Sequence, residues 1–92
     1  MGDAIITFKV MPDSPETDMS ELESVVKKMI SDFCGETQIK AVIEPVAFGL
    51  KALKVTFVID ENKGSPDALE KSISDLDSVN SCDIIDVRRA LG

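Results

Sequence analysis

The stretch from Glu44 to Glu61 constrains the fold most, because it holds the clearest strand pattern in the chain. In its second half, apolar residues alternate with polar ones and fall on one side: Leu53, Val55, Phe57 and Ile59. This period-two pattern is typical of a half-buried strand. The first half, Pro45 to Leu50, predicts a turn that carries an aromatic residue, Phe48, directly before a glycine. A bulky apolar residue at the tip of a turn needs a reason, so we expect function there.

The segments before this stretch predict a strand, a helix and a second strand. Ala4 to Met11 carries apolar residues on both faces, which favours a central strand that ends at Pro12. Asp18 resembles a helix N-cap, and Gly35 is a natural stop. The helix stripe expected to face the core consists of Met19, Leu22, Val26, Met29, Ile30 and Phe33.

Gln38 to Val46 alternates as a strand and forms an antiparallel hairpin with the strand after the turn. Ser65 and Pro66 then predict the N-cap and first residue of a second helix. Its stripe is Leu69, Ile73 and Leu76, with Ala68 and Val79 at the ends. Asn80 and Ser81 break this pattern. Cys82 to Arg89 predicts a last strand with Ile85 and Val87 inward.

The predicted order is therefore strand, helix, strand, strand, helix, strand. A ferredoxin-like split βαβ sandwich of the α+β class accounts for this order best, with a four-stranded antiparallel sheet and both helices on one face. The 92 residues are expected to form a single domain, residues 1–92, with a mainly aliphatic core because only four residues are aromatic.

Composition argues against several classes of function. The net charge of −7 disfavours a direct nucleic-acid partner, and it suits either a basic protein surface or simple solubility. The chain has no histidine, and Cys34 and Cys82 stand far apart, so we expect no zinc site, no other resident metal or cofactor, and no enzymatic reaction. No apolar run approaches the roughly 20 residues of a membrane span. No signal peptide is visible, and the expected compartment is the reducing cytoplasm.

Two further binding modes find little support in the residues. Asp60, Glu61 and Asp67 do not have the spacing of a calcium-binding loop, and a solvated loop explains them better. Recognition of RNA on this fold uses aromatic residues displayed on the sheet, whereas the third strand offers only Phe57, which alternates with the inward set.

Two features remain as interaction candidates. Phe48 either anchors a partner or folds back to cap the end of the core. Arg88 and Arg89 are either a solvated basic end or a pair of cations that reach carboxylates or phosphates, for which the arginine fork favours bidentate contact.

Three segments together resemble the exchange-domain family of translation elongation factor 1-beta, in its short archaeal form. The segments are Val10–Met19 with its Glu-Thr-Asp helix entry, Phe48–Leu53 with its aromatic-Gly-Leu-Lys-x-Leu signature, and Val79–Ile84. They occur in the family's order and spacing, and the resemblance covers nearly the whole chain. It implies the same split βαβ fold.

The resemblance also implies a function: a guanine-nucleotide exchange factor that binds elongation factor 1-alpha in its GDP-bound and nucleotide-free states and promotes release of GDP. In such proteins the turn aromatic contacts the second domain of the GTPase, which corresponds to Phe48, and we extend the predicted contact to Gly49, Leu50 and Lys51. A basic residue near the end of the last strand enters the Mg²⁺ region, and the matching position is Arg89, with Arg88 beside it.

Two departures from the eukaryotic pattern accompany the resemblance. Arg89 stands where the eukaryotic members have lysine, and three residues follow it. The N-terminal region by which eukaryotic members join larger assemblies is also missing, so a two-protein system is expected. The competing hypothesis is a small-molecule-binding regulatory or scaffolding module on the same fold. A glycine-rich loop between the first strand and the first helix would support it, and Pro12 to Asp18 contains no glycine.

Overall fold

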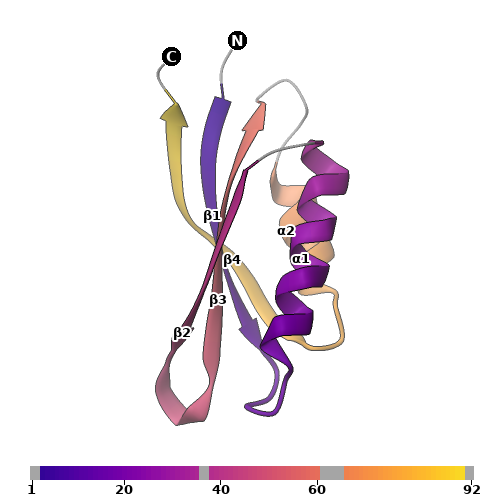
Figure 1. Cartoon of the computed structure of the whole chain (residues 1–92), viewed down its shortest axis with the longest axis vertical. Coiled ribbons are helices and arrows are strands. Elements are labelled where there is room, and N and C mark those ends of the chain that lie inside the picture. Colours follow the sequence, from indigo (N-terminus) through magenta and orange to yellow (C-terminus); the bar gives the residue numbers. More distant parts are fainter. Residues whose placement is uncertain (1–2, 36–37, 61–65, 91–92) are drawn as a thin grey trace.

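A computed structural model describes residues 3–35, 38–60 and 66–90, and shows one four-stranded antiparallel sheet with both helices packed on the same face (Figure 1). The strand order across the sheet is β2-β3-β1-β4. In chain order the elements are β1 (Asp3–Pro12), α1 (Met19–Cys34), β2 (Ile39–Pro45), the short 3₁₀ turn η1 (Ala47–Gly49), β3 (Lys51–Asp60), α2 (Pro66–Ser74) and β4 (Val79–Ala90). The predicted fold class is confirmed.

The core lies between the sheet and the two helices, and the paired central strands β1 and β3 supply its centre. Ile6 lies opposite Phe57, and Phe8 lies opposite Val55. The rings of Phe8 and Phe57 meet edge to face, with centroids 5.2 Å apart. The helices cover these strands with aliphatic side chains that are almost fully buried: Leu22, Val26, Ile30, Leu69 and Ile73. The central position predicted for the first strand and the inward face predicted for the third are both confirmed.

Helix α1 begins and ends at the residues that the sequence predicts. The Asp18 carboxylate accepts hydrogen bonds from the backbone N–H groups of Ser20 and Glu21, at 3.1 and 3.2 Å. At the other end, Gly35 has a φ of 77°, and its N–H donates to the carbonyl of Ser31 at 2.8 Å. A glycine adopts this left-handed conformation without the clash that a Cβ would cause.

Helix α2 is shorter than its apolar pattern predicts. It ends at Ser74, so Leu76 lies in the following turn and Val79 belongs to β4, although both pack against the core. Ala68 is exposed. The predicted N-cap Ser65 and most of the predicted polar loop before it lie outside the described residues.

The prediction for the last strand is wrong in two respects. The strand begins at Val79 rather than Cys82, and its inward residues are Cys82 and Ile84, whereas Ile85 and Val87 are 46% and 58% exposed. A β-bulge explains the exposure of Ile85, which is the extra residue between the pairs of Ile84 and Asp86 with β1. Val87 is paired with the core residue Ile6 and lies on the helix side, but it remains exposed. Figure 1 also shows that the C-terminal end of β4 lies away from both helices, so no helix covers Val87.

Candidate functional site

The turn between β2 and β3 is built by its own backbone. The N–H of Val46 donates to the carbonyl of Leu50 at 2.8 Å, and the N–H of Leu50 donates to the carbonyl of Ala47 at 3.3 Å. Between these bonds, Phe48 has φ 62° and ψ 30°, and Gly49 has a φ of 75°. Two successive residues therefore adopt the left-handed conformation, and the first of them is an aromatic residue.

This conformation turns the phenyl ring of Phe48 away from the protein. Its side chain is 93% exposed, so it does not cap the core, and that alternative for Phe48 is wrong. The left-handed region costs a residue with a Cβ about 1–2 kcal/mol, and bulky residues rarely adopt it. The hairpin thus presents an apolar ring to solvent on a strained backbone.

The other residues of the predicted motif directly follow Phe48 in the chain. Gly49 and Lys51 are exposed, and Leu50 is half-buried. A hollow of about 260 Å³ lies between the hairpin and the β1–α1 loop, and Lys51 and Ile43 contribute to its wall. Ile43 is 37% exposed because β2 is an edge strand that the helices cover only in part. It is a candidate contact residue that the sequence pattern does not single out.

The two arginines lie at the end of β4 and project to opposite faces of the sheet. Arg88 is paired with Ile5, and Arg89 is paired with Ala4. The side chain of Arg88 is 75% exposed, and its Nε lies 3.0 Å from Oδ2 of Asp86. The Arg89 side chain is also exposed. The exposed apolar residues Ile85 and Val87 precede the arginines. The sequence pattern does not identify them as surface residues, because it predicts that both point inward.

The structure does not bring Phe48 and the arginines together. Pro45 pairs with Lys51 at one end of β3, whereas the pairs of Ala4 with Ile59 and with Arg89 lie near the other end. The eight steps along β3 from Lys51 to Ile59 span about 26 Å. The molecule measures 42 × 20 × 18 Å, and Figure 1 shows the hairpin and the end of β4 at opposite ends of the long axis.

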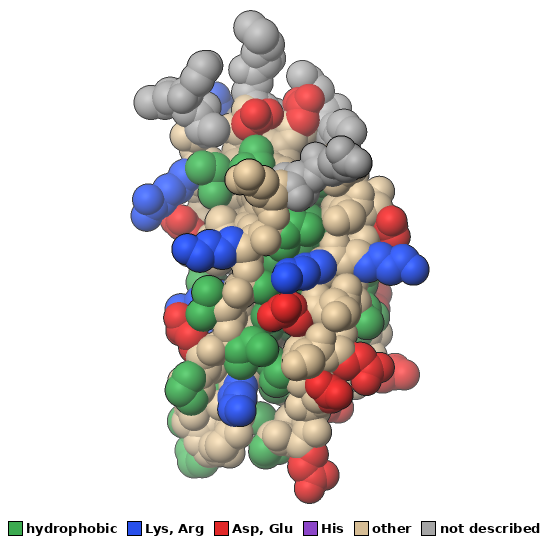
Figure 2. Space-filling view, viewed as in Figure 1, with side chains coloured by type: hydrophobic (Ala, Val, Ile, Leu, Met, Phe, Trp, Pro, Cys, Tyr) green, Lys and Arg blue, Asp and Glu red, His purple; other side chains and the backbone are tan. Residues whose placement is uncertain are grey.

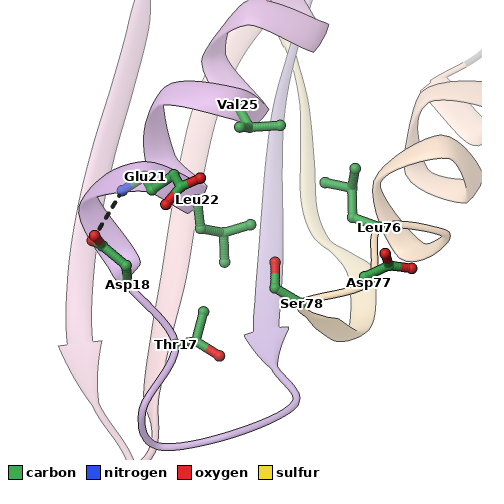
Figure 3. Close-up of a pocket in the computed structure, with 8 residues that line it drawn as sticks. All are labelled: Thr17, Asp18, Glu21, Leu22, Val25, Leu76, Asp77 and Ser78. Atoms are coloured by element: carbon green, nitrogen blue, oxygen red, sulfur yellow. Dashed lines mark hydrogen bonds between the residues drawn. The ribbon is translucent and has the colours of Figure 1, made fainter.

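A second hollow, of about 280 Å³, lies where the start of α1 faces the connection between α2 and β4 (Figure 3). Leu22, Val25 and Leu76 line it from the two sides, and its carboxylates belong to Asp18, Glu21 and Asp77. Acidic side chains also gather at the lower right of Figure 2, where Figure 1 shows the start of α1. The Asp18 carboxylate already caps α1.

The described residues offer no metal-binding cluster, and Cys82 is not an activated thiol. Within them, no three histidine, cysteine, aspartate or glutamate side chains lie close enough to hold a metal ion. Both cysteines are buried and neither forms a disulfide, and burial, with the charges of Glu70 and Asp83 adding to it, raises the pKa of the Cys82 thiol to about 12. A thiol with this pKa is protonated near pH 7 and is a poor nucleophile. No helix within the described ranges has the length and apolar character to cross a membrane.

The chain matches known proteins over almost its whole length. Residues 5–90 match the model of the EF-1 guanine nucleotide exchange domain. Elongation factor 1-beta of Methanothermobacter thermautotrophicus is 38% identical over 91 residues, which cover 99% of this chain and all of the relative. Elongation factor 1-beta of Methanosarcina barkeri is 36% identical over 92 residues, covering 97% of this chain and 99% of the relative.

Solved structures give an independent comparison of the fold. A designed protein, Foldit4, superposes with a TM-score of 0.64 over 98% of both chains. The structure described as BlrP1 BLUF superposes with a TM-score of 0.59 over all of this chain and 57% of that one. At 12% identity these similarities concern the fold alone. The family is shown by sequence: the chain belongs to the family of EF-1 guanine nucleotide exchange domains.

Proposed function

We propose that this chain promotes release of GDP from elongation factor 1-alpha by contacting that GTPase with both ends of its long axis. The Phe48 hairpin, with Gly49, Leu50 and Lys51, anchors one domain of the GTPase. Arg88 and Arg89 act at the nucleotide site. The chain makes and breaks no covalent bond, and no direct contact with nucleic acid is part of the proposal.

The exposure of Phe48 is the observation that supports this role best. An aromatic side chain is 93% exposed, and its backbone holds a conformation that bulky residues rarely adopt. Aromatic residues that enter a pocket of the partner are frequent sources of binding energy, and truncating one typically costs about 2 kcal/mol or more. The ring also needs no rearrangement before it binds, because the turn already holds it outward.

The energetics of exchange require at least one contact that differs between the GDP-bound and nucleotide-free forms of the GTPase. A factor lowers the affinity of a GTPase for GDP only as far as it binds the nucleotide-free form more tightly than the GDP form. Contacts that are equal in both forms give affinity without exchange. The Phe48 end is suited to such a constant contact, since its target is not the nucleotide.

The arginine end is suited to the contact that changes. Arg88 and Arg89 present two guanidinium groups, one on each face of the sheet, at the end of a strand. Guanidinium groups bind phosphate and carboxylate with charge-assisted, often bidentate hydrogen bonds. A cation that reaches the ligands of the Mg²⁺ ion or the site of the phosphates competes with GDP and Mg²⁺ for them. This contact is therefore stronger when the nucleotide is absent.

The test is release of fluorescent GDP from preloaded elongation factor 1-alpha in the presence of excess unlabelled nucleotide. Micromolar amounts of this protein should accelerate the release, and the rate should saturate as the protein concentration rises. No acceleration at micromolar protein would contradict the proposal and would favour the small-molecule-binding alternative on this fold.

A further inference from the structure

The bulge in β4 determines which face each arginine occupies. Ile84 is paired with Phe8, and Asp86 is paired with the preceding residue of β1, Thr7, so Ile85 is the extra residue. On its other side, β1 pairs with β3 without any shift from Asp3 to Val10. The irregularity therefore belongs to β4 and not to the centre of the sheet.

The effect of the extra residue follows from counting along the strand. Without it, the pairs after Ile84 would move by one residue, and Arg88 would lie opposite Ala4 instead of Ile5. A shift of one residue in a strand moves every following side chain to the other face. The bulge thus sets Arg88 on the face of the sheet that the helices leave open and Arg89 on the helix side.

A side chain from α2 holds the backbone at the bulge. Oε2 of Glu70 accepts a hydrogen bond from the N–H of Ile84 at 2.9 Å, in partly buried surroundings. This bond joins two elements whose bonded residues are 14 positions apart. It attaches the edge strand to the helix directly before Ile85. Hydrogen bonds to a charged acceptor are stronger than those to a neutral one, so this contact favours the bulged register.

We propose that Glu70 is a positioning residue for nucleotide exchange: by holding the bulge, it fixes the faces on which Arg88 and Arg89 meet the GTPase. The inference rests on the proposed function, because it assumes that these arginines act at the nucleotide site. Glu70 itself need not touch the partner.

The first test compares Glu70→Ala with Glu70→Gln in the GDP-release assay. Glu70→Ala removes the acceptor, and we expect the maximal release rate to fall about fivefold to tenfold, with the half-saturating concentration changed less than about twofold. Glu70→Gln keeps a carbonyl acceptor and should restore most of the rate. The matched control is Glu23→Ala on α1, where the glutamate forms an ion pair with Lys27 at 3.2 Å, and α1 packs mainly on β3 and α2. This variant should exchange at the normal rate.

The second test separates positioning from a general structural role. In a protein that already carries Arg88→Ala and Arg89→Ala, Glu70→Ala should slow release no further. In a Phe48→Ala protein, Glu70→Ala should slow release as much as it does in the wild-type protein, because the hairpin is at the other end of the molecule. Amide chemical shifts of the residues from Ile84 to Arg89 should change in Glu70→Ala and return toward normal in Glu70→Gln.

Each failure has its own pattern. Normal exchange by the double arginine variant would overturn the proposed role of the arginines and this inference with it. Slow exchange by that variant, combined with normal exchange by Glu70→Ala, would overturn the inference alone. An equal loss from Glu70→Ala with and without the arginines would show that Glu70 only stabilises the fold.

Discussion

The hairpin tip and the C-terminal half of β4 are both exposed strand ends, and they differ in what holds them in place. At the tip, two backbone hydrogen bonds within residues 46–50 fix the turn around Phe48. At the end of β4, the position of Arg88 and Arg89 depends on pairing with β1, on the bulge at Ile85 and on the bond from Glu70. One end is a local structure, and the other is assembled from three elements.

This difference fits the two tasks that we propose. A contact that only anchors the partner benefits from a rigid, locally encoded shape, because preorganisation reduces the entropy lost on binding. A contact that competes with a bound nucleotide needs groups at a defined place, and here the rest of the fold supplies that place. The comparison predicts that the tip tolerates changes elsewhere in the protein and that the β4 end does not.

The largest expected effect is on the reactivity of Cys82, which lies in the N-terminal half of β4, where α2 covers the strand. Because the pKa of Cys82 is raised from an ordinary 9.0 to about 12, its thiolate fraction at pH 8 should be about 1,000-fold below that of an ordinary thiol. In a Cys34→Ser protein, a thiol reagent should therefore label Cys82 at least that much more slowly than it labels the unfolded chain. Rapid labelling of the native protein would show that α2 does not seal this half of the strand.

The same pKa predicts a loss of stability at high pH. Burial is the main cause of the raised pKa, followed by the charges of Glu70 and Asp83. Between about pH 9 and 12 the folded state keeps the thiol proton that the unfolded state has lost, so the free energy of unfolding falls as pH rises. The slope of unfolding free energy against pH should be smaller in Cys82→Ala, since lysine titration is common to both proteins. Equal slopes would contradict the raised pKa.

The next effect concerns the anchor. Phe48→Ala should weaken binding of elongation factor 1-alpha by about 30-fold, close to 2 kcal/mol, because a truncated aromatic anchor loses its contact in the partner's pocket. The half-saturating concentration in the GDP-release assay measures this loss. Val25→Ala, which truncates an exposed apolar residue on α1, is the control and should bind normally. Circular dichroism should be unchanged in both variants, and unfolding of Phe48→Ala would count against a role in the partner contact.

Arg89→Ala should have a smaller effect, and it should change the rate of GDP release rather than the affinity for the partner. We expect the maximal rate of GDP release to fall about tenfold while the half-saturating concentration changes little, because a contact made mainly in the nucleotide-free complex affects the rate. Arg88→Ala should show the same pattern if both arginines act. A variant that raises the half-saturating concentration and leaves the maximal rate intact would make the β4 end a second anchor and remove the distinction between the two ends.

The sequence predicts the tip far better than the β4 end, for a physical reason. The alternation through Phe57 and the Phe48-Gly49 pair are local signals, and they correctly place the strand and its turn. The sequence leaves the exposure of Phe48 open, because both alternatives satisfy the same pattern and only the backbone conformation decides between them. The N-cap Asp18 and the stop at Gly35 are local in the same sense, and both are confirmed.

The bulge in β4 has no comparable signal. Ile84 and Ile85 are consecutive, similar residues, and period-two counting does not indicate which of them faces the core. The choice depends on Glu70, which lies 14 residues earlier in the chain and on a different element. The error at Ile85 therefore has a tertiary cause, whereas Val87 lies opposite the core residue Ile6 and is exposed because neither helix covers that end of the strand. The exposure of Ile43 also depends on tertiary structure, namely on how far the helices extend over an edge strand.

The smallest effects concern the strain at the tip, and they test whether that strain is retained for binding. Phe48→Asn should raise the free energy of unfolding by about 0.5–1 kcal/mol, since asparagine tolerates the left-handed region better than phenylalanine, and it should lose partner binding as Phe48→Ala does. Gly49→Ala should lower the free energy of unfolding by about 1 kcal/mol. A Cβ at Gly49 would meet no atom within 4 Å, so only its φ of 75° opposes the substitution. Thermal unfolding resolves such changes, which shift the melting temperature of a domain this size by about 4–8 °C per kcal/mol. Stabilisation by Phe48→Asn with loss of binding would mean that the turn holds the ring outward at a cost in stability, as strained residues at functional sites do. Destabilisation by Phe48→Asn would instead show that the ring supports the fold, and the tip would lose its separation from the rest of the molecule.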